Sequence, residues 1–308
     1  MALLEVKNLK VHYPIRGGIL GGVQGYVKAV DDITFQIEEG EIMGLVGESG
    51  SGKSTTGKAI IGLAKITGGQ ILYDGKDITG MIGKNHSPYR KSVQMIFQDA
   101  YSSLNPKKRV MDIIAEPLRN FEKLSPMEER KRVDELLDIV GLTPDNAIKY
   151  PHEFSGGQRQ RIGIARAMAL NPRLIIADEP VSALDLSVQA QVLNFMKDIQ
   201  EKFKLSYLFI SHDLGVVEHM CSSIAIMHKG RFVEAGVKEE VYRNPTHIYT
   251  KKLIAAIPDI NPEKREESQR FRQQVAEEYT QRYREYYNDQ DQVYDMKKIS
   301  DGHAVALP

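Results

Sequence analysis

The hydrophobic and polar positions of the first hundred residues follow a strand pattern that one helix interrupts. The strands stand out as short runs of β-branched and aromatic residues, whereas the helix carries apolar positions three and four residues apart. The expected strands are residues 4–13, 26–37, 41–46, 68–74 and 93–97, and the expected helix is residues 53–63. Between the first two strands, residues 16–25 hold five glycines in ten positions, which predicts a flexible hairpin loop.

The middle of the chain is predicted to be helical, and an alternating pattern follows it. Residues 110–120 and 126–140 have helical periodicity, with Val133, Leu136 and Leu137 on one face of the second segment. The elements expected next are a helix at 158–170, a strand at 174–177, a helix at 187–203, a strand at 205–210, a helix at 214–220, and strands at 224–228 and 231–235. Alternating strands and helices predict an α/β domain with a mostly parallel sheet.

The last segment, residues 261–308, has a pattern of its own. Phe271, Val275, Tyr279 and Tyr283 recur every four residues, which predicts an amphipathic helix with an aromatic stripe. We expect this stripe to pack on the preceding domain, and docking onto a partner protein is the alternative. The segment holds eight basic and ten acidic residues, so its net charge is only −2.

Composition and charge narrow the classes of function. The 308 residues hold 41 Lys and Arg against 41 Asp and Glu, and this balance disfavours a nucleic-acid binder, which needs a cationic surface. The single cysteine, Cys221, excludes an intrachain disulfide framework and favours a reducing, cytoplasmic setting. The sequence shows neither a secretory signal nor an apolar run of about 18 residues, so we expect a soluble chain that other polypeptides bring to any membrane.

The strongest chemical signal is the stretch GESGSGKST, residues 47–55, which matches the phosphate-loop pattern G-x-x-x-x-G-K-[ST] between an expected strand and an expected helix. Its glycines let successive backbone N–H groups point at phosphate oxygens, and the helix N-terminus adds positive potential. Lys53 is expected to reach the β- and γ-phosphates, and the Ser54 hydroxyl to bind Mg²⁺. The nucleotide-binding residues are therefore expected to be Gly47, Glu48, Ser49, Gly50, Ser51, Gly52, Lys53, Ser54 and Thr55.

A second acidic site is expected where the apolar strand at 174–177 ends. Asp178 and Glu179 follow that strand directly, at the sheet edge where ligands bind in α/β folds. Asp178 would hold Mg²⁺ through water, and Glu179 would act as general base on the attacking water. Taken together, the two motifs predict an ATPase or a GTPase.

The stretch FSGGQRQR, residues 154–161, resembles the signature of ATP-binding cassette (ABC) proteins. Physically it is a second anion site, because Ser155 caps a helix whose first N–H groups the glycines leave accessible. In that family, the signature of one cassette covers the nucleotide held by the phosphate loop of another. The resemblance assigns this role to Ser155, Gly156, Gly157 and Gln158.

Further matches to the family follow in order along the chain. Gln98 resembles the Q-loop glutamine, which contacts Mg²⁺ or the attacking water, so the resemblance gives the metal three residues, Ser54, Gln98 and Asp178. His212 resembles the switch histidine that contacts the γ-phosphate. Tyr13 resembles the aromatic residue that stacks on adenine, with Tyr26 as a competing candidate. The D-loop, which crosses the dimer interface, is matched by Ser182, Ala183, Leu184 and Asp185. The catalytic set is then Glu179, His212, Gln98 and Lys53.

The resemblance covers residues 3–260 and implies a fold and a division of the chain. The fold is an α/β P-loop cassette of the ABC type, with a mostly parallel sheet, an antiparallel β subdomain and a helical subdomain. The cassette is expected at residues 1–260, with the helical subdomain at about 100–170 inserted in the α/β core. Residues 261–308 are expected to be a partly helical C-terminal extension.

The glycine-rich insert and the stretch NPTHIYTKKL, residues 244–253, look like the ATPases of oligopeptide and dipeptide importers. The resemblance implies an ATP-hydrolysing subunit that couples ATP and Mg²⁺ binding, and hydrolysis at a cassette dimer interface, to peptide uptake. Its partners would be a second, different ABC ATPase subunit, two multispanning permease subunits and, indirectly, an extracytoplasmic solute-binding protein, with no nucleic acid. This chain resembles the second ATPase of such pairs, peripheral at the cytoplasmic face of the cell membrane.

Three other functions remain open from the residues. The branch also contains importers of nickel and other small solutes. A soluble cassette ATPase that acts on nucleic acid or ribosomes would predict tandem cassettes, a coiled-coil insertion or a basic arm, and this chain has a single phosphate loop. A regulatory subunit with a silent site is the third possibility, and the intact catalytic residues Lys53, Glu179 and His212 speak against it.

Overall fold

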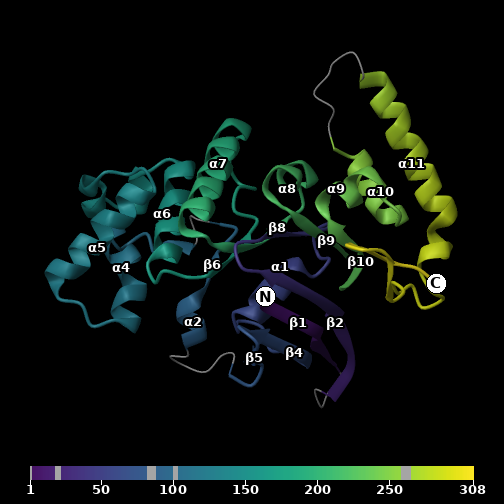
Figure 1. Ribbon diagram of the computed structural model, residues 1–308, viewed down its shortest axis with the longest axis horizontal. Coiled ribbons are helices and arrows are strands. Elements are labelled where there is room, and N and C mark those ends of the chain that lie inside the picture. Colours follow the sequence, from purple (N-terminus) through teal and green to yellow (C-terminus); the bar gives the residue numbers. More distant parts are fainter. Residues whose placement is uncertain (1, 18–21, 82–87, 100–102, 258–264) are drawn as a thin grey trace. The chain divides into compact units, whose positions relative to one another are not determined.

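The computed structural model describes residues 2–17, 22–81, 88–99, 103–257 and 265–308 (Figure 1). The chain forms two compact units. The first unit comprises Met1–Leu3, Ile37–Glu41 and Gly80–Ile210, and the second comprises Leu4–Gln36, Ile42–Thr79 and Ser211–Pro308. This division cuts across the expected cassette and extension. The expected boundary at 260/261 lies outside the described residues, so it stays a prediction.

The first unit is built on parallel strands in the order β8-β7-β6. Its strands are β6 (Val93–Ile96), β7 (Leu174–Asp178) and β8 (Ser206–Ser211), the last of which ends one residue beyond the unit. All residues of β7 and β8 are buried. This burial explains why both read as continuous apolar runs rather than as alternating strands, because helices cover both faces of a parallel sheet.

Most other elements in the described residues of the first unit are helical. They are α2 (Pro88–Ser92), α4 (Val110–Phe121), α5 (Pro126–Ile139), the 3₁₀ turns η1 (Pro144–Ile148) and η2 (Pro151–Glu153), α6 (Gly156–Met168) and α7 (Leu186–Phe203). Helices α4, α5 and α6 pack on one another, and Val133, Leu136 and Leu137 of α5 are buried, as their spacing predicts. The helical subdomain is expected at about residues 100–170, which is this part of the chain. That these helices form a separate subdomain stays a prediction.

The second unit contains two sheets. The antiparallel sheet has the order β2-β1-β4-β5, and the other has the order β11-β12-β10-β9-β3, in which β3 and β9 are parallel and the remaining pairs are antiparallel. The strands are β1 (Ala2–Gly17), β2 (Gly22–Glu38), β3 (Ile42–Val46), β4 (Gly68–Tyr73), β5 (Lys76–Asp77), β9 (Ser223–His228), β10 (Arg231–Val237), β11 (Met296–Ser300) and β12 (His303–Ala306). The expected α/β class is thus confirmed.

The described residues of this unit also contain helices. They are α1 (Lys53–Ile60), α8 (Leu214–Met220), α9 (Lys238–Arg243), α10 (Ile248–Ala255) and α11 (Arg265–Tyr286). Helix α1 is shorter than expected, because Gly62 has a φ of +81°, in the left-handed region, two residues after the helix ends. Helix α11 packs on α10.

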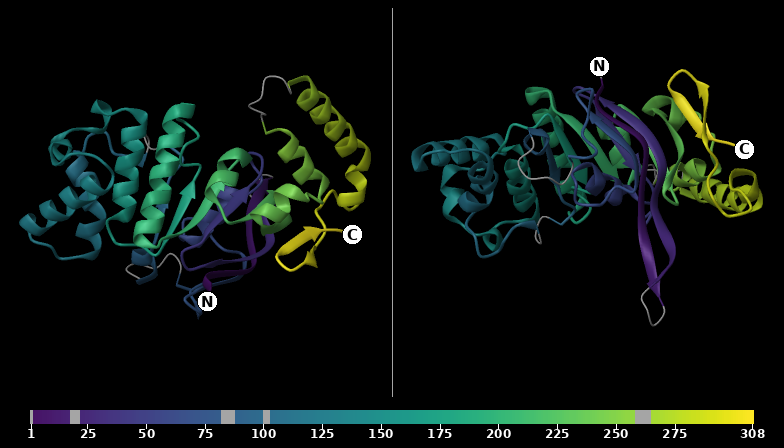
Figure 2. Two further views of the ribbon diagram at one scale, coloured as in Figure 1. Left: turned by 45° about the horizontal axis from the view of Figure 1, so that its top comes forward. Right: turned by 90° about the horizontal axis from the view of Figure 1, so that it is seen from below.

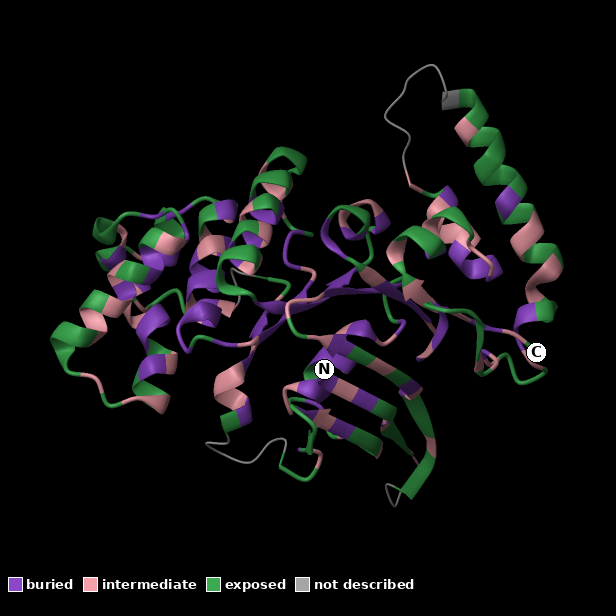
Figure 3. Ribbon diagram, in the orientation of Figure 1, coloured by how far each residue is buried: buried purple, intermediate pink, exposed green. Residues whose placement is uncertain are grey.

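The first hairpin is longer than the sequence predicts. Strand β1 continues to Gly17 and β2 begins at Gly22, so all of the described part of the expected loop at 16–25 is strand, and the two strands run side by side as a long ribbon (Figure 2). Residues 18–21 of that loop lie outside the described residues. Buried residues are concentrated at the end of the ribbon that contains Leu3, Leu4 and Ile37, whereas the residues on either side of 18–21 are largely exposed (Figure 3).

Candidate functional site

The phosphate-loop motif occupies the expected place between a strand and a helix. Strand β3 ends at Val46, residues 47–52 form the loop, and α1 begins at Lys53. Glycine is required at two positions because the backbone of other segments approaches closely. A Cβ atom at Gly47 would lie 2.2 Å from the Met227 carbonyl oxygen, and one at Gly52, whose φ is +112°, would lie 2.2 Å from the Ala29 carbonyl oxygen. A bulkier residue at either position would displace the loop.

Lys53 is buried and is held by the loop that it follows. Its side chain is 4% exposed, and its Nζ donates hydrogen bonds to the carbonyl oxygens of Gly47 at 2.7 Å and Glu48 at 2.9 Å. The first turn of α1, which the structure describes in full, contains no acidic side chain, so the positive end of the helix is not neutralised from within. Loop, lysine and helix end together form a site suited to an anion with several oxygens.

The loop is also braced from the turn between β9 and β10. Gly230 donates its backbone N–H to the Ser51 carbonyl oxygen at 3.0 Å, and its own carbonyl oxygen accepts the Asp31 N–H at 2.8 Å. Strands β3 and β9 are parallel neighbours, with Val46 opposite Ile226, so their carboxyl ends meet at this edge. The rest of the predicted nucleotide-binding set lies in the same segment, namely Ser49, Gly50, Ser54 and Thr55.

In the first unit, the structure brings together the predicted general base and the predicted Q-loop glutamine. Strands β6 and β7 are parallel neighbours, with Ile96 opposite Ala177, so Gln98 and Glu179 leave the sheet at the same edge. The Nε2 atom of Gln98 donates a hydrogen bond to Oε2 of Glu179 at 2.8 Å. Asp178, the last residue of β7, is only 4% exposed.

The signature residues form a capped helix start, as predicted. Ser155 is the N-cap of α6, its Oγ accepts the Gln158 N–H at 3.3 Å, and the Gln158 side-chain oxygen accepts the Ser155 N–H at 3.0 Å. This reciprocal pair is a capping box. Both glycines lie close to the segment that follows β7: a Cβ at Gly156 would lie 3.0 Å from a methyl carbon of Leu184, and one at Gly157 would lie 2.6 Å from a methyl carbon of Val188 on α7.

The predicted D-loop is a turn between β7 and α7. The N–H of Ser182 and its hydroxyl both donate to the carbonyl oxygen of Glu179, at 3.3 and 3.1 Å. Leu184 donates its N–H to the Val181 carbonyl oxygen, and Asp185 stands at the N-cap of α7. The D-loop turn is therefore hydrogen-bonded to the backbone of Glu179, the predicted general base. Ser182, Ala183 and Asp185 are exposed.

The remaining predicted residues lie in the second unit. His212 follows β8 immediately and is exposed. Tyr13 on β1 is 44% exposed and Tyr26 on β2 is 59% exposed, so the two tyrosines are similar in access and the choice between them stays a prediction. The residues that sequence reasoning placed in one site thus form two groups, each built within its own unit, and their catalytic and binding roles remain predictions.

The donor set of the predicted metal residues suits Mg²⁺. Ser54, Gln98 and Asp178 offer hydroxyl, amide and carboxylate oxygens, which are the ligands that Mg²⁺ prefers. Among the described residues, no group of three or more His, Cys, Asp or Glu side chains is placed to hold a metal ion.

Two further contacts of the phosphate loop were missed by the sequence analysis. Tyr249 and Lys252 of α10 both contact Glu48. These residues are more than 200 positions apart in the sequence, and no local pattern links them.

Comparison with protein families matches two parts of the chain. The family described as "ABC transporter" matches residues 30–182, and the family described as "Oligopeptide/dipeptide transporter, C-terminal region" matches residues 233–285. The second range contains α9, α10 and most of α11. None of the helices in the described residues is long and apolar enough to cross a membrane.

Similar proteins cover nearly the whole chain. The oligopeptide transport ATP-binding protein OppF of Lactococcus lactis subsp. lactis (strain IL1403) is 55% identical over 306 residues, which cover 99% of this chain and 96% of that protein. The oligopeptide transport ATP-binding protein AppF of Bacillus subtilis (strain 168) is 52% identical over 257 residues, which cover 83% of this chain and 78% of that protein.

Solved structures agree with these relatives. The structure of cbiO1 from Clostridium perfringens, part of the ABC transporter complex cbiONQ, has a TM-score of 0.65 and 27% identity, and covers 79% of this chain and 91% of that one. The dimeric ATP-binding cassette MJ0796, solved in a post-hydrolysis state with ADP and Pi, has a TM-score of 0.64 and 27% identity over 76% of this chain and 98% of that one. This chain therefore belongs to the ABC transporter family, as a transporter ATPase with an oligopeptide/dipeptide transporter C-terminal region.

Proposed function

We propose that this protein is the ATP-hydrolysing subunit of an importer for oligopeptides or dipeptides, and that it is the second ATPase of a pair. It would work at the cytoplasmic face of the cell membrane with a different ATPase chain, two permease subunits and an extracytoplasmic solute-binding protein. The observation that carries peptide import is the match of residues 233–285 to the C-terminal region of oligopeptide and dipeptide transporters. The names of OppF and AppF support the same substrate class.

For nucleotide binding, the proposal assigns the phosphates to the loop and the adenine to Tyr13. Residues 47–55 would surround the phosphates with backbone N–H groups, and the buried Lys53 ammonium would neutralise their charge. Ser54, Gln98 and Asp178 would hold Mg²⁺, which supplies positive charge to the phosphates when it is bound. Tyr13 would stack on adenine, and its exposed ring is accessible for that contact.

For hydrolysis, the proposal makes Glu179 the general base and Gln98 the residue that orients it. The hydrogen bond from the Gln98 amide fixes the orientation of the carboxylate, which would accept a proton from the attacking water. The N–H and C=O groups of Glu179 are also engaged, by the Ile210 carbonyl oxygen and by Ser182. His212 would contact the γ-phosphate. A base fixed in this way needs little reorganisation when water is activated.

For the partner cassette, the proposal uses the capped start of α6 and the D-loop. The capping box between Ser155 and Gln158 fixes the start of α6, and the first turn of this helix would present its positive end to the nucleotide of the partner cassette. The exposed D-loop residues Ser182 and Asp185 lie beyond the base on the same chain. Contact with a second cassette at these residues would couple pairing to the position of Glu179.

For the permease subunits, the proposal points to a cavity of about 610 Å³ in the first unit. Its lining is mostly polar and includes Asn105, Lys108, Glu116 and Arg166. Its residues 103–121 follow Gln98 closely in sequence, so a change at the nucleotide site has a short path to this surface. A permease segment bound in this cavity would therefore respond to a conformational change at the nucleotide site.

The proposed function is tested on the protein purified with its permease subunits. ATP hydrolysis by the complex in lipid vesicles is measured with added short peptides, free amino acids, Ni²⁺ or ribosomes. Peptides alone are expected to raise the rate several-fold. Stimulation by Ni²⁺ but not by peptides would support the small-solute importer instead. A chain that does not co-purify with membrane subunits, and responds to ribosomes, would support the soluble ATPase.

A further inference from the structure

A tyrosine from the C-terminal region contacts the phosphate loop. The Tyr249 hydroxyl on α10 accepts the backbone N–H of Glu48 at 3.1 Å. Three residues later on the same helix, Nζ of Lys252 lies 3.2 Å from Oε1 of Glu48. The first contact is part-buried and joins backbone to side chain, whereas the second is a half-exposed ion pair, which contributes little in water.

This contact acts on the same peptide group that holds Lys53. The N–H of Glu48 and the C=O of Gly47 belong to one planar peptide unit, in which they point in opposite directions. The N–H is bound by Tyr249, and the C=O accepts the Lys53 ammonium at 2.7 Å. Tyr249 therefore fixes the orientation of the carbonyl group that places the Lys53 side chain.

Tyr249 is itself held in place. Its side chain is fully buried, its ring stacks on His228 with 4.1 Å between centroids, and its backbone N–H donates to Nδ1 of His247 at 3.1 Å. Burial, with the Glu48 carboxylate nearby, raises the pKa of Tyr249, so the phenol stays protonated. A neutral hydroxyl with a fixed ring is a well-defined acceptor for the loop.

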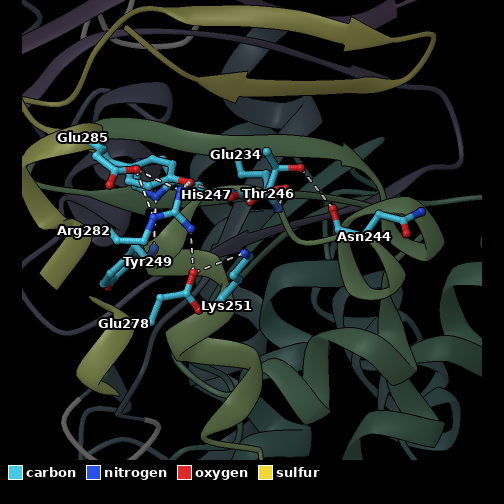
Figure 4. Close-up of polar contacts among 10 residues, drawn as sticks. Glu234, Asn244, Thr246, His247, Tyr249, Lys251, Glu278, Arg282 and Glu285 are labelled. Carbon is cyan, nitrogen blue, oxygen red and sulfur yellow. Dashed lines mark hydrogen bonds and ion pairs between the residues drawn. The ribbon is translucent and has the colours of Figure 1, made fainter. Parts of the chain in front are cut away.

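The helix that carries Tyr249 is anchored by the C-terminal segment (Figure 4). Oε1 of Glu278 on α11 lies 2.7 Å from Nη1 of Arg282 on the same helix and 3.7 Å from Nζ of Lys251 on α10. At the start of α10, the fully buried Glu234 accepts the N–H groups of Thr246 and His247, at 2.8 and 2.9 Å. Nε2 of His303 on β12 lies 2.7 Å from Oε1 of the same carboxylate. Strand β12 therefore also helps to hold the start of α10 in place.

We propose that Tyr249 is a positioning residue for ATP. By holding the Gly47–Glu48 peptide, Tyr249 places the Lys53 side chain before ATP binds. Through Tyr249, the C-terminal region therefore sets the affinity of the phosphate loop for ATP. The inference rests on ATP binding at this loop, which is part of the proposed function, and does not depend on the transported solute. It assigns the C-terminal region a role at the nucleotide, in addition to any role at a partner surface.

The test uses the full-length chain with Tyr249→Phe, which removes the hydroxyl and keeps the ring. Tyr242→Phe is the matched control, because the Tyr242 hydroxyl donates to the Leu214 carbonyl oxygen at 2.5 Å in the same unit and does not contact the loop. The dissociation constant of ATP is measured by calorimetry without Mg²⁺, and KM and kcat of hydrolysis with Mg²⁺. Lys252→Met is run alongside to isolate the exposed ion pair.

Tyr249→Phe is expected to raise the ATP dissociation constant and KM about three- to tenfold, the factor that one neutral hydrogen bond is worth, with kcat within about twofold. Tyr242→Phe and Lys252→Met are expected to change both by less than about twofold. An unchanged dissociation constant in Tyr249→Phe, or an equal rise in Tyr242→Phe, would overturn the inference. A wild-type chain that does not bind ATP would instead overturn the proposed function.

Discussion

The side-chain amide of Gln98 donates a hydrogen bond to the carboxylate of Glu179, with 2.8 Å between Nε2 and Oε2. Glu179 also has a φ of +47°, in the left-handed region that residues other than glycine rarely adopt. Such backbone strain persists where the surrounding structure fixes it, and it concentrates at functional sites. In this site the Ile210 carbonyl oxygen and the Ser182 N–H hold the backbone of Glu179 from both sides.

Glu179→Gln is expected to abolish hydrolysis and to leave ATP binding intact. The amide has the same shape and its oxygen can still accept from Gln98, but it cannot take a proton from water. The loss of a general base costs about 10²–10⁴-fold in rate, so kcat should fall by at least about 100-fold. Steady-state phosphate release and ATP binding by calorimetry measure the two effects. A variant that turns over within tenfold of the wild type would remove Glu179 from the role of base.

Ser155→Ala is expected to reduce hydrolysis by the cassette pair without weakening ATP binding to the same chain. The substitution removes the N-cap of α6, which costs about 1 kcal/mol of stability, and it removes a hydroxyl from the predicted anion site. Ser125→Ala is the control, because Ser125 forms a capping box of the same kind with Glu128 on α5. Chemical denaturation reports the stability of both variants, and phosphate release reports their activity.

The two serine variants should therefore match in stability and differ in activity. We expect Ser155→Ala to lose about tenfold or more in kcat and Ser125→Ala to stay within twofold, because only the first is proposed to face a nucleotide. Equal losses of activity would mean that α6 contributes nothing beyond its fold.

Stability is expected to fall as the pH is lowered from 7 to 5, in part because of His247. Burial, with His228 nearby, lowers the pKa of His247 to about 3, so the folded chain keeps this ring neutral while the unfolded chain protonates it below about 6.5. The unfolded state then binds the extra proton, and the stabilisation, complete above pH 6.5, is lost as the pH falls. For His247 alone the loss by pH 5 is about 2 kcal/mol.

His247→Asn tests this assignment. The His247 ring accepts the Tyr249 N–H as the N-cap of α10, and an Asn side chain can accept the same N–H without titrating. Urea unfolding at pH 7 and pH 5 gives the free energy of unfolding of both proteins. The difference in this free energy between the wild type and the variant should be smaller at pH 5 than at pH 7. A gap that is constant across the two pH values would contradict the role of His247.

Local features of the site were predictable from the sequence. The loop at 47–52 requires glycine, the start of α6 requires a cap, and the apolar run at 174–177 requires burial. Each of these requirements can be recognised from residues that are neighbours in the sequence. The contact between Gln98 and Glu179 followed less directly, since it needs β6 and β7 to be parallel neighbours. The sequence predicted both strands and their sheet, and the pairing placed the two side chains together.

The C-terminal strands were not predictable in the same way. Strand β11 reads MKKIS and is mostly exposed, so it lacks the alternation of apolar and polar residues that marks a half-buried strand. What fixes β12 in the sheet is its pairing with β10 and the contact of His303 with Glu234, 69 positions away. Such long-range partners have no local signal.

The aromatic stripe of α11 was predicted largely correctly. Val275 is 5% exposed, Tyr279 lies near Tyr249, and the Tyr283 hydroxyl accepts a hydrogen bond from Nζ of Lys229 at 2.8 Å. Phe271, one turn before Val275, is 54% exposed. The expected packing on the domain therefore holds for three of the four positions, because the first turns of α11 extend beyond the surface that covers the rest.

The most direct test of the account is peptide uptake by the complete transporter. The complex of this chain with its partner ATPase and permease subunits is placed in vesicles with the solute-binding protein on the outside, and entry of a labelled peptide is followed with ATP inside. We expect uptake that requires ATP and falls to background when this chain carries Glu179→Gln. Uptake at the wild-type rate in that variant, or uptake without ATP, would contradict it.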